Sequence, residues 1–233
     1  MSSLKVFENN GGQFLVSESV FISRLNSVKA FVFDWDGVFT DGHKDQDSNS
    51  RFSEVDSMGC NLLRFSFFLR NNELPLAGMI SGENNRTSFM FSSREGFHSN
   101  YFKVAKKADA IEHFCAQQRV LPQEIAYVFD DVLDLSVAKE CGLRIYIPRQ
   151  SNPMLNNYVA KNKLADYMTF SSSGNNPVRE TCELLMTAYG LYDEAIDHRI
   201  SYSEQYAEYI ALRRATKTKY FTVTEGRIAE TTV

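Results

Sequence analysis

The sequence predicts an α/β fold, a doubly wound parallel sheet with helices on both faces. Short apolar runs alternate with longer amphipathic stretches, an order typical of βαβ units. The first such run, Ala30–Phe33, is apolar at every position and is therefore expected to form a central strand covered on both sides. Two carboxylates follow it one residue apart, where open α/β sheets bind their ligands.

The remaining elements follow the same rhythm along the chain. The expected strands are Ala30–Phe33, Leu76–Ile80, Ile125–Phe129, Leu143–Ile147 and Tyr167–Phe170. The expected helices lie at about Gly59–Arg70, Asn84–Arg94, Ala105–Gln117, Val132–Glu140, Pro153–Lys163 and Val178–Tyr189. A further helix is expected from about Ser203 to Ala215, followed by a β-prone stretch at Tyr220–Val223.

One segment interrupts this rhythm. Residues 41–54 combine turn-forming residues with alternating flanks, which predicts a β-hairpin flap at about 39–55 and no large cap domain. The chain is then expected to divide into an N-terminal extension (1–27), an α/β domain (28–190) and a C-terminal helical and strand extension (191–233).

Composition excludes several classes of function. With 233 residues, of which 43% are apolar, the chain can bury a full core. A net charge of −4, without blocks of basic residues, argues against a nucleic-acid partner. No apolar run approaches the roughly 18 residues of a membrane span, and the N-terminus lacks a signal-peptide pattern. The four cysteines are widely spaced, which favours reduced core thiols, no zinc site and a cytoplasmic location.

The acidic pair Asp34 and Asp36 is the strongest chemical signal. Gly37 follows it, so the chain is expected to leave the sheet there and bring the two carboxylates side by side. The competing interpretation is a pair of turn-forming or helix-capping aspartates.

Polar groups also follow the next strands. Ser81 comes after one strand, Lys106-Lys107 opens a helix, and Asp130, Asp131 and Asp134 follow another strand. Carboxylates about 4 Å apart repel by about 4 kcal/mol at an effective dielectric constant near 20, so such a cluster needs a cation. An all-oxygen ligand set favours Mg²⁺, and Ser81 with a lysine offers donors to a phosphate. Taken alone, Ser81 is also a common helix cap, and Lys103 or Lys106 is an alternative to Lys107.

These motifs resemble the haloacid dehalogenase superfamily, and within it the 3-deoxy-D-manno-octulosonate 8-phosphate phosphatase branch. The resemblance covers about residues 28–190. It rests on D-W-D-G-V-F-T-D-G, the hairpin leading to Phe52 and Asp56, Ile80-Ser81-Gly82, Lys107 eleven residues after Gly96, F-D-D-V-L-D-L, and the segment from Ala165 to Glu180. Asp56 matches a family aspartate and equally suits a helix cap.

The resemblance implies a fold, a reaction and roles for residues. The fold is a haloacid-dehalogenase-like Rossmannoid domain, and the substrate is a phosphorylated 2-keto-3-deoxy sugar acid of eight or nine carbons. Asp34 is the expected nucleophile, and Asp36 the acid and base. Mg²⁺ is held by Asp34, the Asp36 carbonyl oxygen and Asp130. Ser81 and Lys107 bind the phosphoryl group, while Asp131 and Asp134 lie behind the metal ligands and orient Lys107.

The chain departs from the branch in its expected recognition residues. Glu83 and Phe91 stand where the branch has arginines, and Ser173–Asn176 replaces a glycine-rich segment. Arg86, Arg94 or Lys103 is a candidate replacement charge, although each also suits a solvated position.

Other functions remain open at this stage. One is a phosphatase for another small phosphate ester, and another is a catalytically idle binding or assembly subunit. A receiver-type phospho-acceptor is disfavoured because an acidic cluster follows the lysine. The resemblance and an apolar stripe of Tyr206, Tyr209, Ile210 and Leu212 predict a homo-oligomer, a tetramer, whose subunits close one another's sites. We assign that stripe, together with Tyr202, to a subunit or domain contact.

Overall fold

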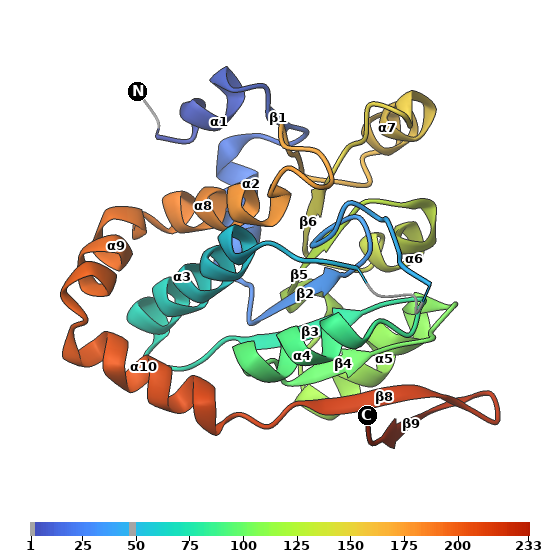
Figure 1. The fold of residues 1–233 in the computed structure, drawn as a ribbon. Helices are drawn as coiled ribbons and strands as arrows, with labels where there is room; N and C mark the ends of the chain where they lie inside the picture. The colour runs from blue at the N-terminus through green and yellow to red at the C-terminus, as the bar shows by residue number, and fades with distance from the viewer. Residues whose placement is uncertain (1–2, 47–49) are drawn as a thin grey trace.

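The computed structural model describes residues 3–46 and 50–233, which form one continuous sheet with helices on both faces (Figure 1). The strands are β1 (Gln13–Phe14), β2 (Ala30–Asp34), β3 (Leu76–Ile80), β4 (Ser99–Tyr101), β5 (Ile125–Phe129), β6 (Leu143–Tyr146), β7 (Tyr167–Met168), β8 (Lys219–Thr224) and β9 (Arg227–Thr231). Their spatial order is β1-β7-β6-β5-β2-β3-β4-β8-β9. All neighbouring pairs from β7 to β8 are parallel, and the outermost pairs β1/β7 and β8/β9 are antiparallel. The predicted α/β class and parallel sheet are confirmed.

The helices fill the connections. They are α1 (Lys5–Asn9), α2 (Glu18–Asn26), α3 (Glu54–Asn71), α4 (Arg86–Glu95), α5 (Lys107–Gln118), α6 (Leu135–Ala138), α7 (Pro153–Lys161), α8 (Pro177–Tyr189), α9 (Tyr192–Ser201) and α10 (Glu204–Ala215), with 3-10 turns at Pro122–Glu124 and Val132–Asp134. Helices α3 and α8 pack side by side on one face of the sheet. No helix of the described ranges is both long and apolar enough to cross a membrane.

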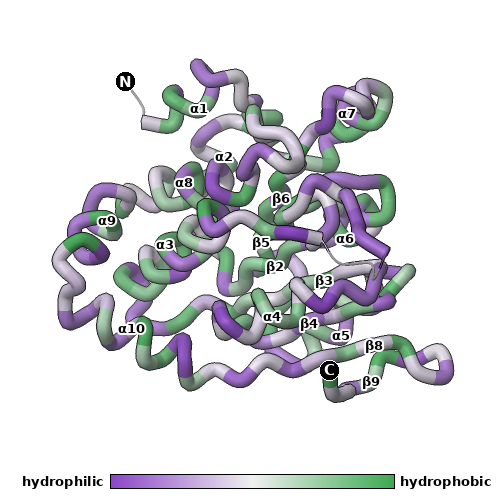
Figure 2. The backbone as a smooth tube through the Cα atoms, viewed as in Figure 1, coloured by the Kyte–Doolittle hydropathy of each residue, from purple (hydrophilic) through white to green (hydrophobic). Residues whose placement is uncertain are grey.

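The core has two layers because successive strand residues point to opposite faces. In β2, Phe31 and Phe33 join the apolar cluster under α3 and α8, while Ala30 and Val32 join the cluster on the α5 side. Figure 2 shows the hydrophobic colour along the central strands β5 and β6 and mixed colours along the outer helices. Burial on both faces explains why the central strands are apolar at every position.

The predicted flap is corrected by the structure. Within the segment at 39–55, residues 41–46 and 50–53 form a loop with no strand, and residues 47–49 lie outside the described residues. An isolated two-stranded hairpin is marginal in water, and the polar sequence here supplies no apolar face to stabilise one. Residues 41–46 and 50–53, on either side of that gap, are therefore irregular.

The two extensions add to the main sheet. Strand β1 pairs with β7, and β8 pairs with β4, so the sheet runs past both predicted boundaries at 27 and 190. Helices α1, α2 and α9 and strands β1, β4 and β9 were not predicted. The three-residue β4 is short and contains Ser99 and Asn100, which hides it from a pattern search for apolar runs.

Candidate active site

The candidate site lies at the carboxyl ends of the central strands. Asp34 is the last residue of β2, and its register partner Ile80 ends β3, so Ser81 emerges beside it. Asp130 follows β5 on the other side of β2. Parallel pairing brings these strand ends to one edge of the sheet, which is why residues far apart in sequence meet here.

Lys107 connects two of the carboxylates. Its Nζ donates to Oδ1 of Asp34 at 2.7 Å and to Oδ1 of Asp134 at 2.6 Å, and its side chain is 4% exposed. Burial by itself lowers the pKa of Lys107, but the charges of Asp34 and Asp134 outweigh it and raise the pKa above its ordinary value. The ammonium group is therefore charged, and it is fixed between two carboxylates.

Asp34, Asp130 and Asp134 form a buried cluster. One carboxylate oxygen from each lies within 4.8 Å of the others. Burial raises the pKa of Asp34 well above its ordinary value, with a further contribution from Asp134, and burial raises the pKa of Asp130 to about 6. Ionised carboxylates that are buried within 4.8 Å of one another repel, so their ionised state is unfavourable unless positive charge is bound among them.

The cluster fits a divalent cation. Asp130 Oδ1 and Asp134 Oδ2 are buried and have no hydrogen-bond partner among the described residues. Buried carboxylate oxygens without partners are what a hard cation with oxygen ligands requires. Asp134 thus lies among the groups that can hold the ion. The family resemblance had implied a position behind the metal ligands instead. Its Oδ1 is shared by Lys107 and by the hydroxyl of Tyr127.

Asp36 lies next to this cluster with a different set of partners. Its carboxylate accepts hydrogen bonds from Ser50 Oγ at 3.3 Å and from Ser81 Oγ at 3.4 Å, and it pairs with Lys44 Nζ at 3.3 Å. The Asp36 side chain is 23% exposed, in contrast to Asp34 at 5%. The two aspartates of the motif thus differ in environment: Asp34 is buried, and Asp36 is accessible to solvent.

Two other sequence candidates fall outside the cluster. Asp131 is exposed, and its carboxylate accepts from the backbone N–H of Val132 at 2.6 Å, which is a capping role. The Lys106 side chain is 78% exposed and pairs with Asp109. The structure therefore selects Lys107 rather than Lys106 as the lysine that meets Asp34.

Arg149 is a residue of the site that the sequence analysis did not predict. Its Nε and Nη2 donate to Oδ2 of Asp130 at 2.9 and 2.7 Å. A signal was available, because Arg149 follows the predicted strand Leu143–Ile147 and so must emerge at the same edge of the sheet.

Gly37 makes room for this pair. Its φ is +88°, and a Cβ there would lie 2.1 Å from Asp130 Oδ2 and 2.2 Å from Arg149 Nη2. Only glycine combines that backbone angle with so close an approach. The glycine after the acidic pair is therefore required by packing at the site as well as by the turn.

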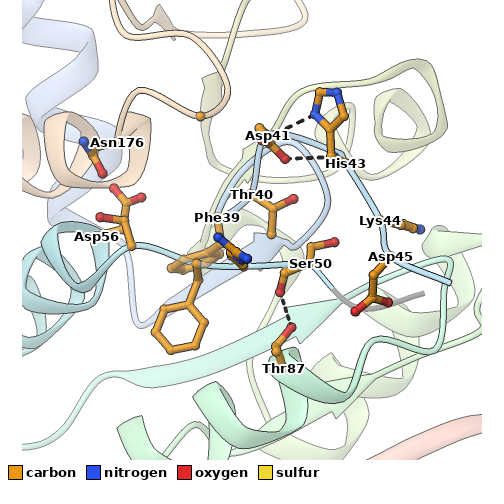
Figure 3. A pocket seen from close by; sticks show the side chains of 14 residues that line it. Phe39, Thr40, Asp41, His43, Lys44, Asp45, Ser50, Asp56, Thr87 and Asn176 are labelled. Atoms are coloured by element: carbon orange, nitrogen blue, oxygen red, sulfur yellow. Dashed lines mark hydrogen bonds and ion pairs between the residues drawn. The ribbon is translucent and has the colours of Figure 1, made fainter. Parts of the chain in front are cut away.

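A cavity of about 640 Å³ is lined by Lys44 and Ser50, two of the residues that contact Asp36, and Figure 3 shows its lining side chains. Asp56 lies at the far side of this cavity. Burial raises the pKa of Asp56 to about 7, and its Oδ1 accepts from the backbone N–H of Arg179 at 2.8 Å. The cavity is thus lined by the Lys44 ammonium group near Asp36 and by the Asp56 carboxyl group, whose pKa is raised, together with Arg51, Asp41 and Asp45.

Two of the departures from the family pattern, Phe91 and the segment 173–176, lie around this cavity, whereas Glu83 does not line it. Gly174 and Asn176 line it, and Ser173 Oγ donates to the carbonyl oxygen of Thr40 at 3.0 Å. Phe91 is fully buried against the rings of Phe39 and Phe52. An apolar side chain at position 91 therefore builds an aromatic cluster under the cavity rather than contacting a ligand.

Three residues, Arg86, Arg94 and Lys103, were candidates to replace the missing arginines, and none of them lines the cavity near Asp36. Arg94 pairs with Glu54 at 2.6 Å and with Glu95 at 3.1 Å. Lys103 and Arg86 line a different cavity, together with Phe89, Met90 and Tyr220. Lys44 and Arg51, which line the main cavity, were not singled out from the sequence.

The tyrosine stripe packs within the chain. Tyr206 and Tyr209 are buried, and their hydroxyls donate to Asn61 Oδ1 and to the Asn61 carbonyl oxygen at 2.8 and 3.0 Å. The stripe is therefore a contact between α10 and α3 of one molecule, which removes it as support for a subunit interface. Leu212 and Tyr202 remain exposed.

Comparison with known proteins agrees with this geometry. The 3-deoxy-D-manno-octulosonate 8-phosphate phosphatase KdsC of Escherichia coli K12 is 26% identical over 178 residues, 75% of this chain and 87% of that protein. A probable YrbI family phosphatase from Pseudomonas syringae has a similar structure, with a TM-score of 0.65 at 24% identity, covering 79% of this chain and 98% of that one. No family model matches the chain.

A third similar protein was solved with ligands. The structure of 3-deoxy-D-manno-octulosonate 8-phosphate phosphatase from Moraxella catarrhalis, in complex with magnesium ion, phosphate ion and a KDO molecule, has a TM-score of 0.63 at 21% identity and covers 78% of this chain and 98% of that one. The structural similarity confirms the predicted fold. The sequence relatives confirm the predicted resemblance to this branch of phosphatases and the expected enzyme class, a phosphoric monoester hydrolase.

Proposed function

We propose that this chain is a Mg²⁺-dependent phosphomonoester hydrolase that uses Asp34 as its nucleophile. The observation that carries the proposal is the position of Lys107, whose Nζ holds Asp34 Oδ1 at 2.7 Å at the edge of a buried carboxylate cluster. A fixed lysine beside a carboxylate supplies positive charge where a phosphoryl group would develop negative charge. Asp34, Asp130 and Asp134, with the Asp36 carbonyl oxygen, are the groups proposed to hold Mg²⁺.

The proposed reaction has two steps. An oxygen of Asp34 attacks phosphorus, the bond to the leaving alkoxide breaks, and Asp36 gives that alkoxide its proton. The Asp36 carboxylate then takes a proton from water, whose oxygen attacks phosphorus and releases phosphate and Asp34. When bound, Mg²⁺ neutralises negative charge on the carboxylates and the phosphoryl oxygens.

The environments of the two aspartates support this division of roles. Asp36 is partly exposed and lies within 3.4 Å of Ser81 Oγ, so it can exchange protons with water and with a leaving group. Asp34 is buried, and burial raises its pKa in the metal-free site. A bound cation would favour the ionised form that attack requires. Ser81 and Lys107 are the proposed donors to the transferred phosphoryl group.

The proposed substrate is a phosphorylated 2-keto-3-deoxy sugar acid. The names of the relatives support this class, and the cavity of about 640 Å³ beside Asp36 has room for the sugar. Lys44 and Arg51 line that cavity and can meet a substrate carboxylate. Because Phe91 and Glu83 replace expected arginines, another small phosphate ester is the second candidate.

The decisive experiment is hydrolysis of an aryl phosphate by the purified protein with Mg²⁺ and with EDTA. We expect turnover with Mg²⁺ only, and none from Asp34→Asn. Asp197→Asn, an exposed change on α9, is the matched control and should keep full activity. Metal-independent turnover, or turnover by Asp34→Asn, would remove Asp34 from its proposed role.

A substrate screen then tests the specificity. Eight- and nine-carbon keto-sugar phosphates are compared with hexose phosphates and nucleotides. We expect a keto-sugar acid phosphate to have the highest kcat/KM. A hexose phosphate or nucleotide that exceeds it by about tenfold would favour the second candidate.

The homo-oligomer, a tetramer, stays part of the proposal. The cavity is open to water along the loop that carries His43, whose side chain is 90% exposed. A neighbouring subunit that covered this loop would exclude water from the reaction. Light scattering that reports a fully active monomer would contradict this part.

A further inference from the structure

A second cavity, which we call the arginine cavity, lies where α3, α4, α9 and α10 meet. Its volume is about 320 Å³, and its charged lining consists of Arg94, Arg199, Arg213, Arg214, Glu54 and Glu95. Figure 1 shows α10 passing beside α3 and α4 on the side of the molecule away from α7. None of these residues takes part in the proposed reaction.

The arginine cavity carries excess positive charge. Four arginines against two glutamates leave a formal charge of +2, on a chain whose net charge is −4. Both glutamates are already paired. Glu95 accepts from Arg94 Nε at 3.1 Å and from Arg213 Nη1 at 2.6 Å, and Glu54 pairs with Arg94 at 2.6 Å.

Arg199 and Arg214 have side-chain N–H groups that are not used within the part of the chain that the structure describes. No hydrogen bond or ion pair joins the side chain of Arg199 or Arg214 to any residue in the described parts of the chain, and the guanidinium of Arg199 stacks over the Tyr206 ring at 5.1 Å. The Nε atoms of Arg199 and Arg213 are buried, and neither finds an acceptor among the described residues. A buried charged donor without an acceptor is costly, so these groups favour a ligand that supplies oxygens.

Helix ends account for only part of this charge. Arg94, Arg199, Arg213 and Arg214 lie in or beside the last turns of α4, α9 and α10, where cations offset the partial negative charge of the helix. At α4, however, buried Arg64 already donates to the carbonyl oxygens of Glu95 and Gly96. That helix end is satisfied without Arg94 or Arg213, which pair with Glu54 and Glu95 at the wall of the cavity.

We propose that the arginine cavity binds a small oxyanion with at least two negative charges, carried by phosphate or carboxylate groups. Guanidinium groups form paired hydrogen bonds with both kinds of oxyanion. Tyr206 provides a rigid wall that holds Arg199 in place. This proposal is independent of the proposed hydrolase activity.

The test is calorimetric titration of the full chain with inorganic phosphate and, separately, with citrate. The protein is first stripped of metal with EDTA, which is then removed by dialysis because it is itself a polycarboxylate, and sodium chloride keeps the ionic strength constant. We expect saturable binding that weakens by about tenfold or more in the double variant Arg199→Gln and Arg214→Gln. Tighter binding of phosphate or of citrate identifies the preferred group.

Two controls make the result specific. The double variant Arg119→Gln and Arg227→Gln removes the same charge from exposed positions elsewhere and should bind like the wild type. Ser81→Ala alters the catalytic crevice and should also leave this binding unchanged. Binding that survives in the Arg199 and Arg214 variant but is lost in Ser81→Ala, or no saturable binding to the wild type, would overturn the proposal.

Discussion

Arg149 binds only one of the two carboxylate oxygens of Asp130. Its Nε and Nη2 both reach Oδ2, at 2.9 and 2.7 Å, while Oδ1 is buried without a partner among the described residues. The guanidinium thus holds Oδ2 and leaves Oδ1 of this cluster residue without a partner among the described residues. Partners of metal-binding carboxylates orient them in this way.

The first prediction concerns this orientation. Arg149→Met should weaken Mg²⁺ binding by about tenfold, because the carboxylate of Asp130 loses the group that holds it. Titration of the metal-free protein with Mg²⁺ measures the change. Arg144→Met is the matched control, since Arg144 makes a similar pair with buried Asp166 at 2.7 Å but lies outside the cluster. Unchanged or tighter Mg²⁺ binding by Arg149→Met would show that the arginine competes with the cation.

The second prediction concerns Asp36. Asp36→Asn keeps the shape of the side chain but cannot donate or accept the proton, so kcat should fall by about 10²–10⁴-fold. Steady-state kinetics with an aryl phosphate measures this, and Asp197→Asn again serves as the control. A rate equal to that of the wild type would assign the proton transfer to another group.

The third prediction tests the contact between α10 and α3. In Tyr206→Phe the buried Asn61 Oδ1 loses the hydroxyl that donates to it at 2.8 Å. The free energy of unfolding should fall by about 1–3 kcal/mol. Tyr202→Phe, at a residue that is 54% exposed, should change stability by less than about 0.5 kcal/mol. Urea denaturation of the three proteins measures both values, and equal effects would mean that the Asn61 contact adds no stability.

The fourth prediction concerns pH and Asp56. Burial raises the pKa of Asp56 from 3.8 to about 7, so the folded protein holds this proton more tightly than the unfolded chain. The resulting stability is fully present below about pH 4 and is lost as the pH rises through about 7. Asp56→Asn cannot ionise, and its free energy of unfolding should therefore fall less between pH 5 and pH 8, by up to about 2.6 kcal/mol. Parallel slopes for Asp56→Asn and the wild type would show that Asp56 titrates in its ordinary range.

The predicted fold followed from patterns along the chain. Strands β3 and β5 begin and end where their apolar runs do, because a strand buried on both faces needs apolar residues throughout. The hairpin flap was wrong because alternation in a polar segment carries no information about a partner strand. Strand β4 was missed because Ser99 and Asn100 are buried through hydrogen bonds, such as Asn100 Nδ2 to Ser92 Oγ at 2.8 Å.

The candidate site was likewise predictable from the sequence only in part. By itself the sequence determined that Asp34, Ser81 and Asp130 follow parallel strands, and hence that they meet at one edge of the sheet. Only the tertiary structure decided that Lys107 rather than Lys106 reaches Asp34, that Asp134 joins the cluster and that Arg149 binds Asp130. Backbone pairing follows a repeating pattern that can be read along a chain, whereas the direction of a charged side chain depends on burial and on partners that lie far away in sequence.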